Sequence, residues 1–139
     1  MLRQLSLAAA LSLAAPTLAH AERILTATSP DGTLEVILRI DGSDRPTWFA
    51  RKDGETVMGP GRLGMRFAAR PAFEEGIKMT GLSRGTVDET WEQPWGERRL
   101  VRDAHEEMVA VLIDAEGREI DLRLRVFDDG FGFRYEVPE

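Results

Sequence analysis

Residues 119–137, EIDLRLRVFDDGFGFRYEV, decide the fold class of this chain. Apolar side chains occupy every second position on both sides of an Asp-Gly pair, at Ile120, Leu122, Leu124 and Val126 and then at Phe131, Phe133, Tyr135 and Val137. A period of two places alternate side chains on one face of an extended strand. Asp129-Gly130 is a dipeptide that suits the tight turn between two antiparallel strands. The stretch therefore predicts a β-hairpin with one apolar face.

Three further Asp-Gly pairs divide the first part of the chain into short segments, at Asp31-Gly32, Asp41-Gly42 and Asp53-Gly54. Between the first two pairs, apolar residues again occupy every second position, at Leu34, Val36, Leu38 and Ile40. Residues 47–51 follow as the expected return strand. Turn signals at such regular intervals predict consecutive hairpins, which are typical of a sandwich or barrel.

The middle of the chain gives two further signals. We interpret Gly59-Pro60-Gly61 as a turn outside any sheet, because proline has no amide hydrogen to donate to a ladder. Beyond this turn, an alternating pattern predicts a third short strand that ends before Pro71, with apolar residues at Leu63, Met65 and Phe67.

Residues 104–116 fit two patterns. Asp103 and Glu106 have the spacing of a helix capping box, and Gly117 follows as a helix stop. A strand that turns at residues 114–118 is favoured instead by β-branched residues at alternate positions, Val109, Val111 and Ile113. We favour the strand, so the sequence predicts an all-β fold, an antiparallel β-sandwich.

The start of the chain predicts export. Residues 1–21 begin with Arg3, continue as an apolar run and end in Ala19-His20-Ala21, which is the pattern of a cleavable signal peptide. The apolar run is too short for a membrane anchor and is broken by Pro16. We therefore expect one domain over residues 22–139, located in the periplasm or secreted, with no membrane contact after the signal is removed.

Composition argues against several classes of function. The chain has no cysteine, and hence neither disulfides nor thiolate chemistry. Its formal net charge is −6 and its basic residues are dispersed among acidic ones, which argues against a nucleic-acid partner. No serine lies in a Gly-x-Ser-x-Gly elbow, and no glycine-rich loop carries the lysine of a nucleotide-binding motif.

Residues 88–107 combine seven carboxylates with Trp91, Trp95 and His105. This mixture suits sugar binding, because indole rings stack on the C–H faces of a pyranose and carboxylates accept hydrogen bonds from its hydroxyls. A structural interpretation competes with it. In that interpretation the tryptophans, including Trp48, cover the core or a loop, the acids form a solvated face, and His105 lies at the surface or makes a hydrogen bond. The acids lack the spacing of an EF-hand, so any calcium site would have to be assembled from distant strands.

The chain resembles the N-terminal domain of glycoside hydrolase family 97 in several blocks. The blocks are residues 29–32 (SPDG), 62–65 (RLGM), 87–91 (VDETW), 95–97 (WGE), 102–103 (RD) before His105 and Glu107, and 124–136 (LRVFDDGFGFRYE). The resemblance runs from about residue 29 to residue 139.

This resemblance implies a large exported enzyme that cleaves α-glucosides or α-galactosides with calcium at its active site, and in which a β-super-sandwich precedes a (β/α)8 barrel. In the family, the catalytic groups and most calcium ligands belong to the barrel. The resemblance therefore implies only part of the super-sandwich for this chain, with no catalytic residue, metal ligand or cofactor of its own. Because loops of the family's sandwich face the barrel, Trp95, Glu97 and His105 are the candidates for a substrate-side or interdomain surface.

Three hypotheses follow for function. The first is a non-catalytic sandwich that packs on the barrel of a glycosidase and shapes its carbohydrate site. The second is a stand-alone carbohydrate-binding module. The third is a truncated gene product without activity, whose last strand leaves an unpaired edge.

Overall fold

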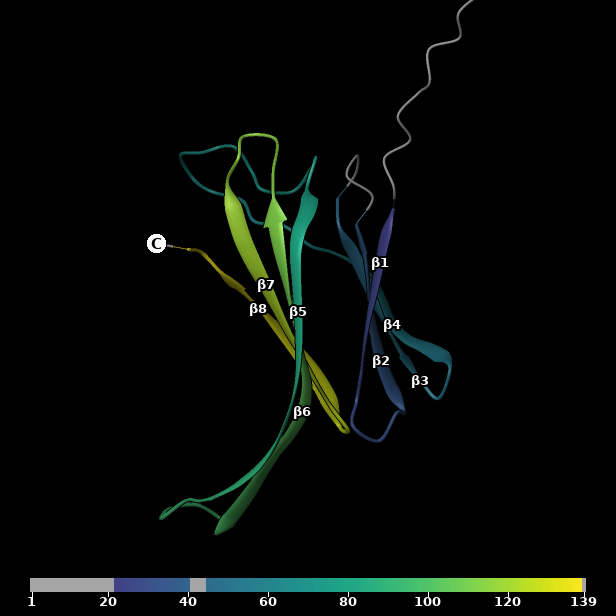
Figure 1. The fold of residues 1–139 in the computed structure, drawn as a ribbon, viewed down its shortest axis with the longest axis vertical. Helices are drawn as coiled ribbons and strands as arrows, with labels where there is room; N and C mark the ends of the chain where they lie inside the picture. The colour runs from purple at the N-terminus through teal and green to yellow at the C-terminus, as the bar shows by residue number, and fades with distance from the viewer. Residues whose placement is uncertain (1–21, 41–44, 139) are drawn as a thin grey trace, which may run out of the picture.

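The structure is a computed structural model that describes residues 22–40 and 45–138, and every regular element among them is a β-strand. Eight strands form two four-stranded antiparallel sheets that pack face to face (Figure 1). The first sheet contains β1 (Arg23–Thr28), β2 (Leu34–Ile40), β3 (Thr47–Lys52) and β4 (Glu55–Arg62), and the second contains β5 (Lys78–Glu92), β6 (Leu100–Ile113), β7 (Glu119–Phe127) and β8 (Gly130–Glu136). Within each sheet, strands that are consecutive in the sequence pair with each other. The predicted antiparallel β-sandwich is confirmed.

Two predictions concern residues outside the described part of the chain, namely the signal peptide at residues 1–21 and the turn at Asp41-Gly42. Within residues 22–40 and 45–138, no helix is long and apolar enough to cross a membrane.

The hairpins form largely as the sequence predicts. Asp53-Gly54 joins β3 to β4, and φ is positive at both residues, 50° at Asp53 and 82° at Gly54, which is the conformation that a two-residue hairpin turn requires. The last hairpin pairs β7 with β8, but Gly130 already pairs with Phe127. Its turn residues are therefore Asp128 and Asp129, one position earlier than predicted.

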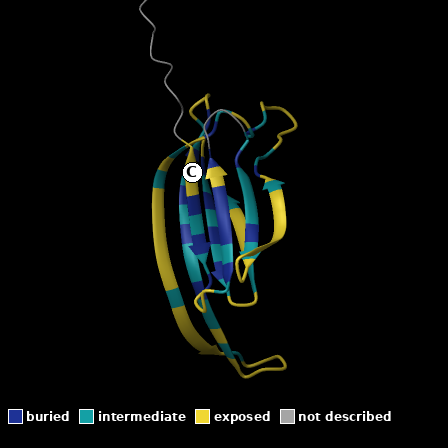
Figure 2. Cartoon of the chain, turned by 90° about the vertical axis from the view of Figure 1, so that its right-hand side faces the viewer, coloured by how far each residue is buried: buried dark blue, intermediate teal, exposed yellow. Residues whose placement is uncertain are grey.

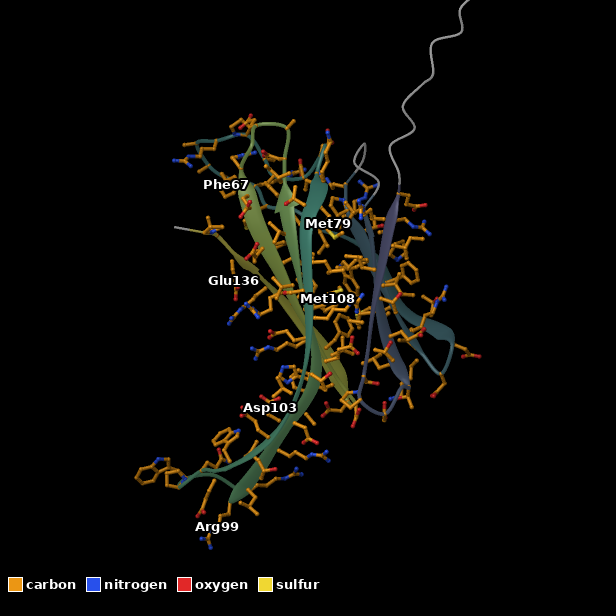
Figure 3. The ribbon with its side chains drawn as sticks, in the orientation of Figure 1. Phe67, Met79, Arg99, Asp103, Met108 and Glu136 are labelled. Carbon is orange, nitrogen blue, oxygen red and sulfur yellow. The ribbon has the colours of Figure 1, made fainter. Side chains whose placement is uncertain are left out.

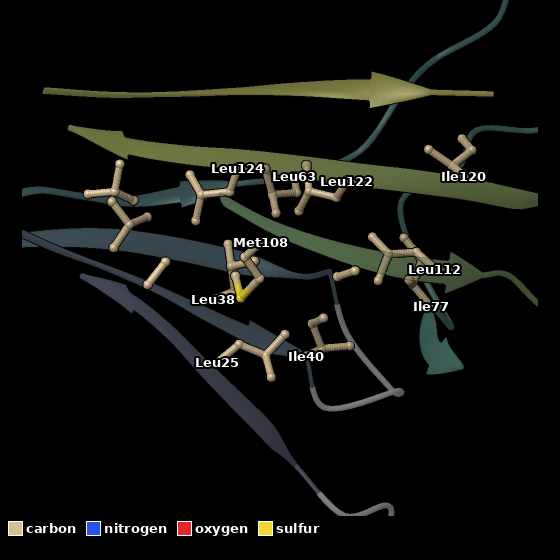
Figure 4. Packing of buried hydrophobic residues seen from close by; sticks show 14 of the residues in the cluster. Leu25, Leu38, Ile40, Leu63, Ile77, Met108, Leu112, Ile120, Leu122 and Leu124 are labelled. Carbon is tan, nitrogen blue, oxygen red and sulfur yellow. The ribbon is translucent and has the colours of Figure 1, made fainter. Parts of the chain in front are cut away.

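Alternate side chains of both sheets meet in a single core. Leu38 of β2, Met108 of β6 and Leu124 of β7 lie between the sheets and are almost completely buried (Figure 4). Residues 104–113 form a strand because every second side chain from Met108 enters this core, whereas the local capping-box signal offers no comparable burial. The chain then turns at residues 114–118, where the Asp114 carboxylate accepts hydrogen bonds from the backbone N–H groups of Glu116 and Arg118.

Two predictions for the middle of the chain are wrong. Gly59-Pro60-Gly61 lies inside β4, which is an edge strand whose outer side has no neighbour. The register shifts between Trp48 and Ala50, so Gly59 and Pro60 have no ladder partner and the missing amide hydrogen of Pro60 costs no hydrogen bond. The predicted third strand is also not formed. Among Leu63, Met65 and Phe67, only Met65 forms a β-bridge, and its partner is Phe73.

Candidate functional site

The hairpin of β5 and β6 extends beyond the rest of the sandwich. The two strands pair from Lys78↔Ile113 to Glu92↔Leu100, whereas β6 pairs with β7 only as far as Glu106↔Val126. Residues 87–105 therefore form a two-stranded projecting ribbon about 15–20 Å long, at about 3.4 Å per residue. The ribbon bends away from the first sheet, toward the outer side of the second (Figure 1). Most of β5 is exposed along its length (Figure 2).

The tip of the projecting ribbon is ordered by its own polar groups. The backbone N–H of Gln93 donates to the Arg99 carbonyl, and the Gln93 side-chain amide donates to the Arg98 carbonyl. Arg99 pairs with Glu92 at 2.6 Å across the loop. Figure 3 shows Arg99 at this end of the ribbon. These bonds hold a defined loop that presents Trp95 and Glu97 to solvent.

The ribbon tryptophans do not cover the core. Trp95 is 83% exposed and Trp91 is 48% exposed, so the core or loop-covering interpretation is wrong for both in the described chain. The reason is their position on a two-stranded segment that has no opposing sheet. Trp48 does cover the core as expected, with its ring centroid 5.4 Å from that of Phe131.

His105 lies at the base of the projecting ribbon and is only 1% exposed. Its Nδ1 is 2.5 Å from Oδ1 of Asp103, and its ring centroid is 4.9 Å from that of Phe127. Of the two expected roles, at the surface or in a hydrogen bond, the structure shows the hydrogen bond, and the buried ring lies against Phe127. The Nε2 atom is buried and has no hydrogen-bond partner. Of the three predicted site residues, the structure brings Trp95 and Glu97 together on the tip and leaves His105 at the other end of the ribbon.

An ionic network that was not predicted from the sequence lies on the outer face of the second sheet. Glu107 accepts hydrogen bonds from Arg123 at 2.5 Å and from Arg125 at 2.8 Å. Arg123 also donates two bonds to Glu136, at 2.9 and 3.0 Å. The signal was present, since Arg123 and Arg125 alternate with the core leucines and so must share the opposite face.

This network disfavours acid catalysis by its own carboxylates. The hydrogen bond from Arg123, helped by Arg134, lowers the pKa of Glu136 from 4.5 to about 2. A general acid at neutral pH needs a raised pKa, because it must hold a proton to give to the leaving group. The arrangement is therefore suited to holding a surface in place. Figure 3 shows Glu136 and Asp103 on the same outer side of the second sheet.

Two hollows of the surface lack a catalytic constellation as well. One, about 500 Å³, lies by the turn at the end of β6 opposite the ribbon tip and is lined mainly by apolar groups, with Glu119 as its one carboxylate. A smaller hollow of about 220 Å³ lies over Gly132, between Arg123, Arg125 and Phe127. In the described part of the chain, no group of three or more Asp, Glu, His or Cys side chains converges as a metal site would require.

Comparison with known proteins gives concordant matches. Residues 27–139 match the family model described as glycosyl-hydrolase 97 N-terminal. A retaining α-galactosidase of Bacteroides thetaiotaomicron is 24% identical over 116 residues, which cover 84% of this chain and 17% of that enzyme.

Solved structures agree with these matches. A glycoside hydrolase family 97 enzyme of Pseudoalteromonas sp. strain K8, in complex with panose, superposes with a TM-score of 0.77 at 33% identity, covering 83% of this chain and 18% of that one. The same enzyme is also known in complex with acarbose. A β-arabinopyranosidase shares the fold, with a TM-score of 0.76 at 23% identity over 83% of this chain and 18% of its own. The chain thus spans less than a fifth of the length of these relatives.

Proposed function

Because this chain belongs to the glycosyl-hydrolase 97 N-terminal family, we propose that it serves as the non-catalytic β-sandwich of an exported glycosidase, where it packs on the catalytic portion and shapes one wall of the carbohydrate site. The substrate class is an α-glucoside or an α-galactoside. Support for an oligosaccharide comes from the relative that is 33% identical and is known in complex with panose and with acarbose.

One observation supports the docking role above all others: the projecting ribbon presents apolar side chains that its own domain leaves uncovered. Trp91, Trp95 and Leu100 are all exposed, and the register of the two strands places Trp91 and Leu100 on opposite faces of the ribbon. An isolated two-stranded hairpin is marginally stable in water. Exposed apolar side chains on such a hairpin mark a segment that another domain covers.

The outer face of the second sheet continues this docking surface. Trp91 and Asp103 share this face with Glu107 and Arg123, because the strands alternate sides in register. Glu107 and Glu136 are already paired with arginines. Another domain can therefore cover this face without burying an unpaired ion. The orphan Nε2 of His105, at the base of the ribbon, is the one buried side-chain nitrogen in the described residues that still needs a partner.

Export and calcium are parts of the same proposal. Residues 1–21 have the composition of a signal peptide, which supports a periplasmic or secreted location. The described residues do not fit a calcium site, since their acidic side chains form no group of three. Calcium bound by the complete enzyme therefore takes its ligands from other parts of that enzyme.

A domain exchange tests the proposal. Residues 27–139 replace the matched segment of the Pseudoalteromonas enzyme, and hydrolysis of para-nitrophenyl α-glucoside is measured. We expect an active chimera, and we expect the double substitution Trp91→Ser and Trp95→Ser to lower its kcat/KM at least about tenfold, because a shifted wall misplaces the groups around the reacting bond. The control is Val57→Ser, which changes an exposed apolar side chain on β4 outside the ribbon. Equal activity of the double variant and the control would contradict the docking role.

The exposed indoles also support a second candidate, a stand-alone carbohydrate-binding module. Titration of the isolated chain with panose distinguishes the two. A binding module shows saturable quenching of tryptophan fluorescence that Trp95→Ala removes, whereas a docking ribbon gives a flat titration.

A further inference from the structure

The hollow of about 220 Å³ on the outer face of the second sheet has β8 as its floor. Gly132 pairs with Arg125 and Gly130 pairs with Phe127, so both glycines lie on the same face as those two side chains. A Cβ atom at either glycine would meet nothing within 4 Å. The backbone of β8 is therefore bare at this point, and the hollow has room for a side chain from outside the domain.

The lining of this hollow carries three arginines, Arg123, Arg125 and Arg134, and no carboxylate. Each arginine has an ionic partner, but two carboxylates, Glu107 and Glu136, are shared among the three guanidiniums. Arg123 uses all of its nitrogens in these pairs. Arg125 donates to Glu107 only from Nε, at 2.8 Å. Within residues 22–40 and 45–138, the N–H groups on both terminal nitrogens of Arg125 are therefore left without an acceptor.

Water can satisfy these spare donors while the face is exposed, since the side chain of Arg125 is 43% exposed. Under the proposed function another part of the glycosidase covers this face, toward which the projecting ribbon bends (Figure 1). Covering the face removes that water, and buried donors without an acceptor are costly. A neutral acceptor would satisfy the N–H groups. Only a carboxylate also offsets the positive charge that the two shared glutamates leave, and its two oxygens match the geometry of a guanidinium.

We propose that one acidic side chain, Asp or Glu, of the catalytic portion inserts into the hollow over Gly132 and accepts hydrogen bonds from Arg125. The ring of Phe127 then lines the hollow beside the apolar stem of the inserted side chain. This inference rests on the proposed function for the source of the acid. Gly132 determines the fit, because a side chain as large as leucine at that position would occupy the place of the acid.

Carbodiimide cross-linking of the chimera tests this contact directly. The reagent joins a lysine amine to a carboxylate with loss of water, which the carbodiimide takes up, and residues 27–139 contain lysine only at Lys52 and Lys78. Arg125→Lys places an amine beside the hollow. Mass spectrometry of the digested product should show a link from the introduced lysine to an Asp or Glu outside the grafted residues. Arg39→Lys, at an exposed position on β2, is the control and should give no such link.

The size of the side chain at residue 132 supplies a second measurement. In the Arg125→Lys background, Gly132→Ala should retain the link, because its Cβ fits within the open space. Gly132→Leu should abolish the link by filling the hollow. Melting temperatures of the isolated chain with each substitution, close to that of the unsubstituted chain, verify that the domain remains folded.

Three results would overturn the inference: links that reach only Glu107 or Glu136, a link between two copies of the chimera, or a link that survives Gly132→Leu. The link is measured whether or not the chimera hydrolyses substrate. An active chimera without a link to the catalytic portion would refute the inserted acid alone and leave the docking role intact. An inactive chimera that still gives the link would contradict the proposed function and support the contact.

Discussion

Gly61→Ala tests the packing that joins β3, β4 and β8. A Cβ atom at residue 61 would lie 2.5 Å from Cε2 and 2.8 Å from Cζ2 of the Trp48 indole and still closer to Nε1. The indole cannot move aside freely, because it also packs against Phe131 and Phe133. Overpacking of this kind costs about 1–3 kcal/mol, and a displaced aromatic pair costs about 0.5–1.5 kcal/mol more. We expect the free energy of unfolding to fall by about 1.5–4.5 kcal/mol in total.

Urea unfolding followed by circular dichroism measures this change, with Gly85→Ala as the matched control. A Cβ at Gly85 meets nothing within 4 Å, and its backbone is not in the left-handed region, so the same substitution there should be neutral or stabilise by up to about 1 kcal/mol. Equal midpoints for the two variants would refute the packing of Trp48 against Gly61.

Three further substitutions test the core, the ribbon and the ionic network. Met108→Ala, in the fully buried part of β6, should lower the free energy of unfolding by about 2–5 kcal/mol in urea, and a change near zero would contradict a core position. Trp95→Ala should change the free energy of unfolding by less than about 0.5 kcal/mol, because the indole contacts little of its own domain. A large decrease in the free energy of unfolding would show that the indole packs against the domain. Arg123 and Arg134 hold the pKa of Glu136 at about 2 rather than 4.5. The stabilisation of the folded state by the ionised Glu136 is therefore complete above pH 4.5 and is lost as the pH falls toward 2. Glu136→Gln should remove this part of the acid dependence of the melting temperature, and unchanged acid slopes would argue against the Arg123–Glu136 pair.

Predictions from local pattern were correct wherever the pattern and the tertiary environment favoured the same structure. Leu34 to Ile40 on β2 and Ile120 to Val126 on β7 alternate because one face of each strand meets the opposing sheet. The turn at Asp53-Gly54 was predicted correctly because positive φ is a local property of those two residues.

Predictions failed where the result depends on the position of a strand within a sheet. Pro60 is compatible with β4 only because that strand is at the edge of its sheet. The position of a strand within a sheet cannot be predicted from its own sequence pattern. His105 is buried although it lies on the outer face, because Phe127 comes from a neighbouring strand that is distant in the sequence.

By itself, the sequence determined that this chain forms antiparallel strands joined by tight turns, and its blocks of residues indicated the family, because side-chain alternation and turn conformation depend on neighbours along the chain. Only the tertiary structure decided that residues 87–105 project beyond the sandwich, that Trp95 and Glu97 lie far from His105, and that β4 and β8 are the last strands of their sheets in the described part of the chain. These features follow from where pairing with a third strand stops and how two sheets are offset, which are set by the packing of the whole domain.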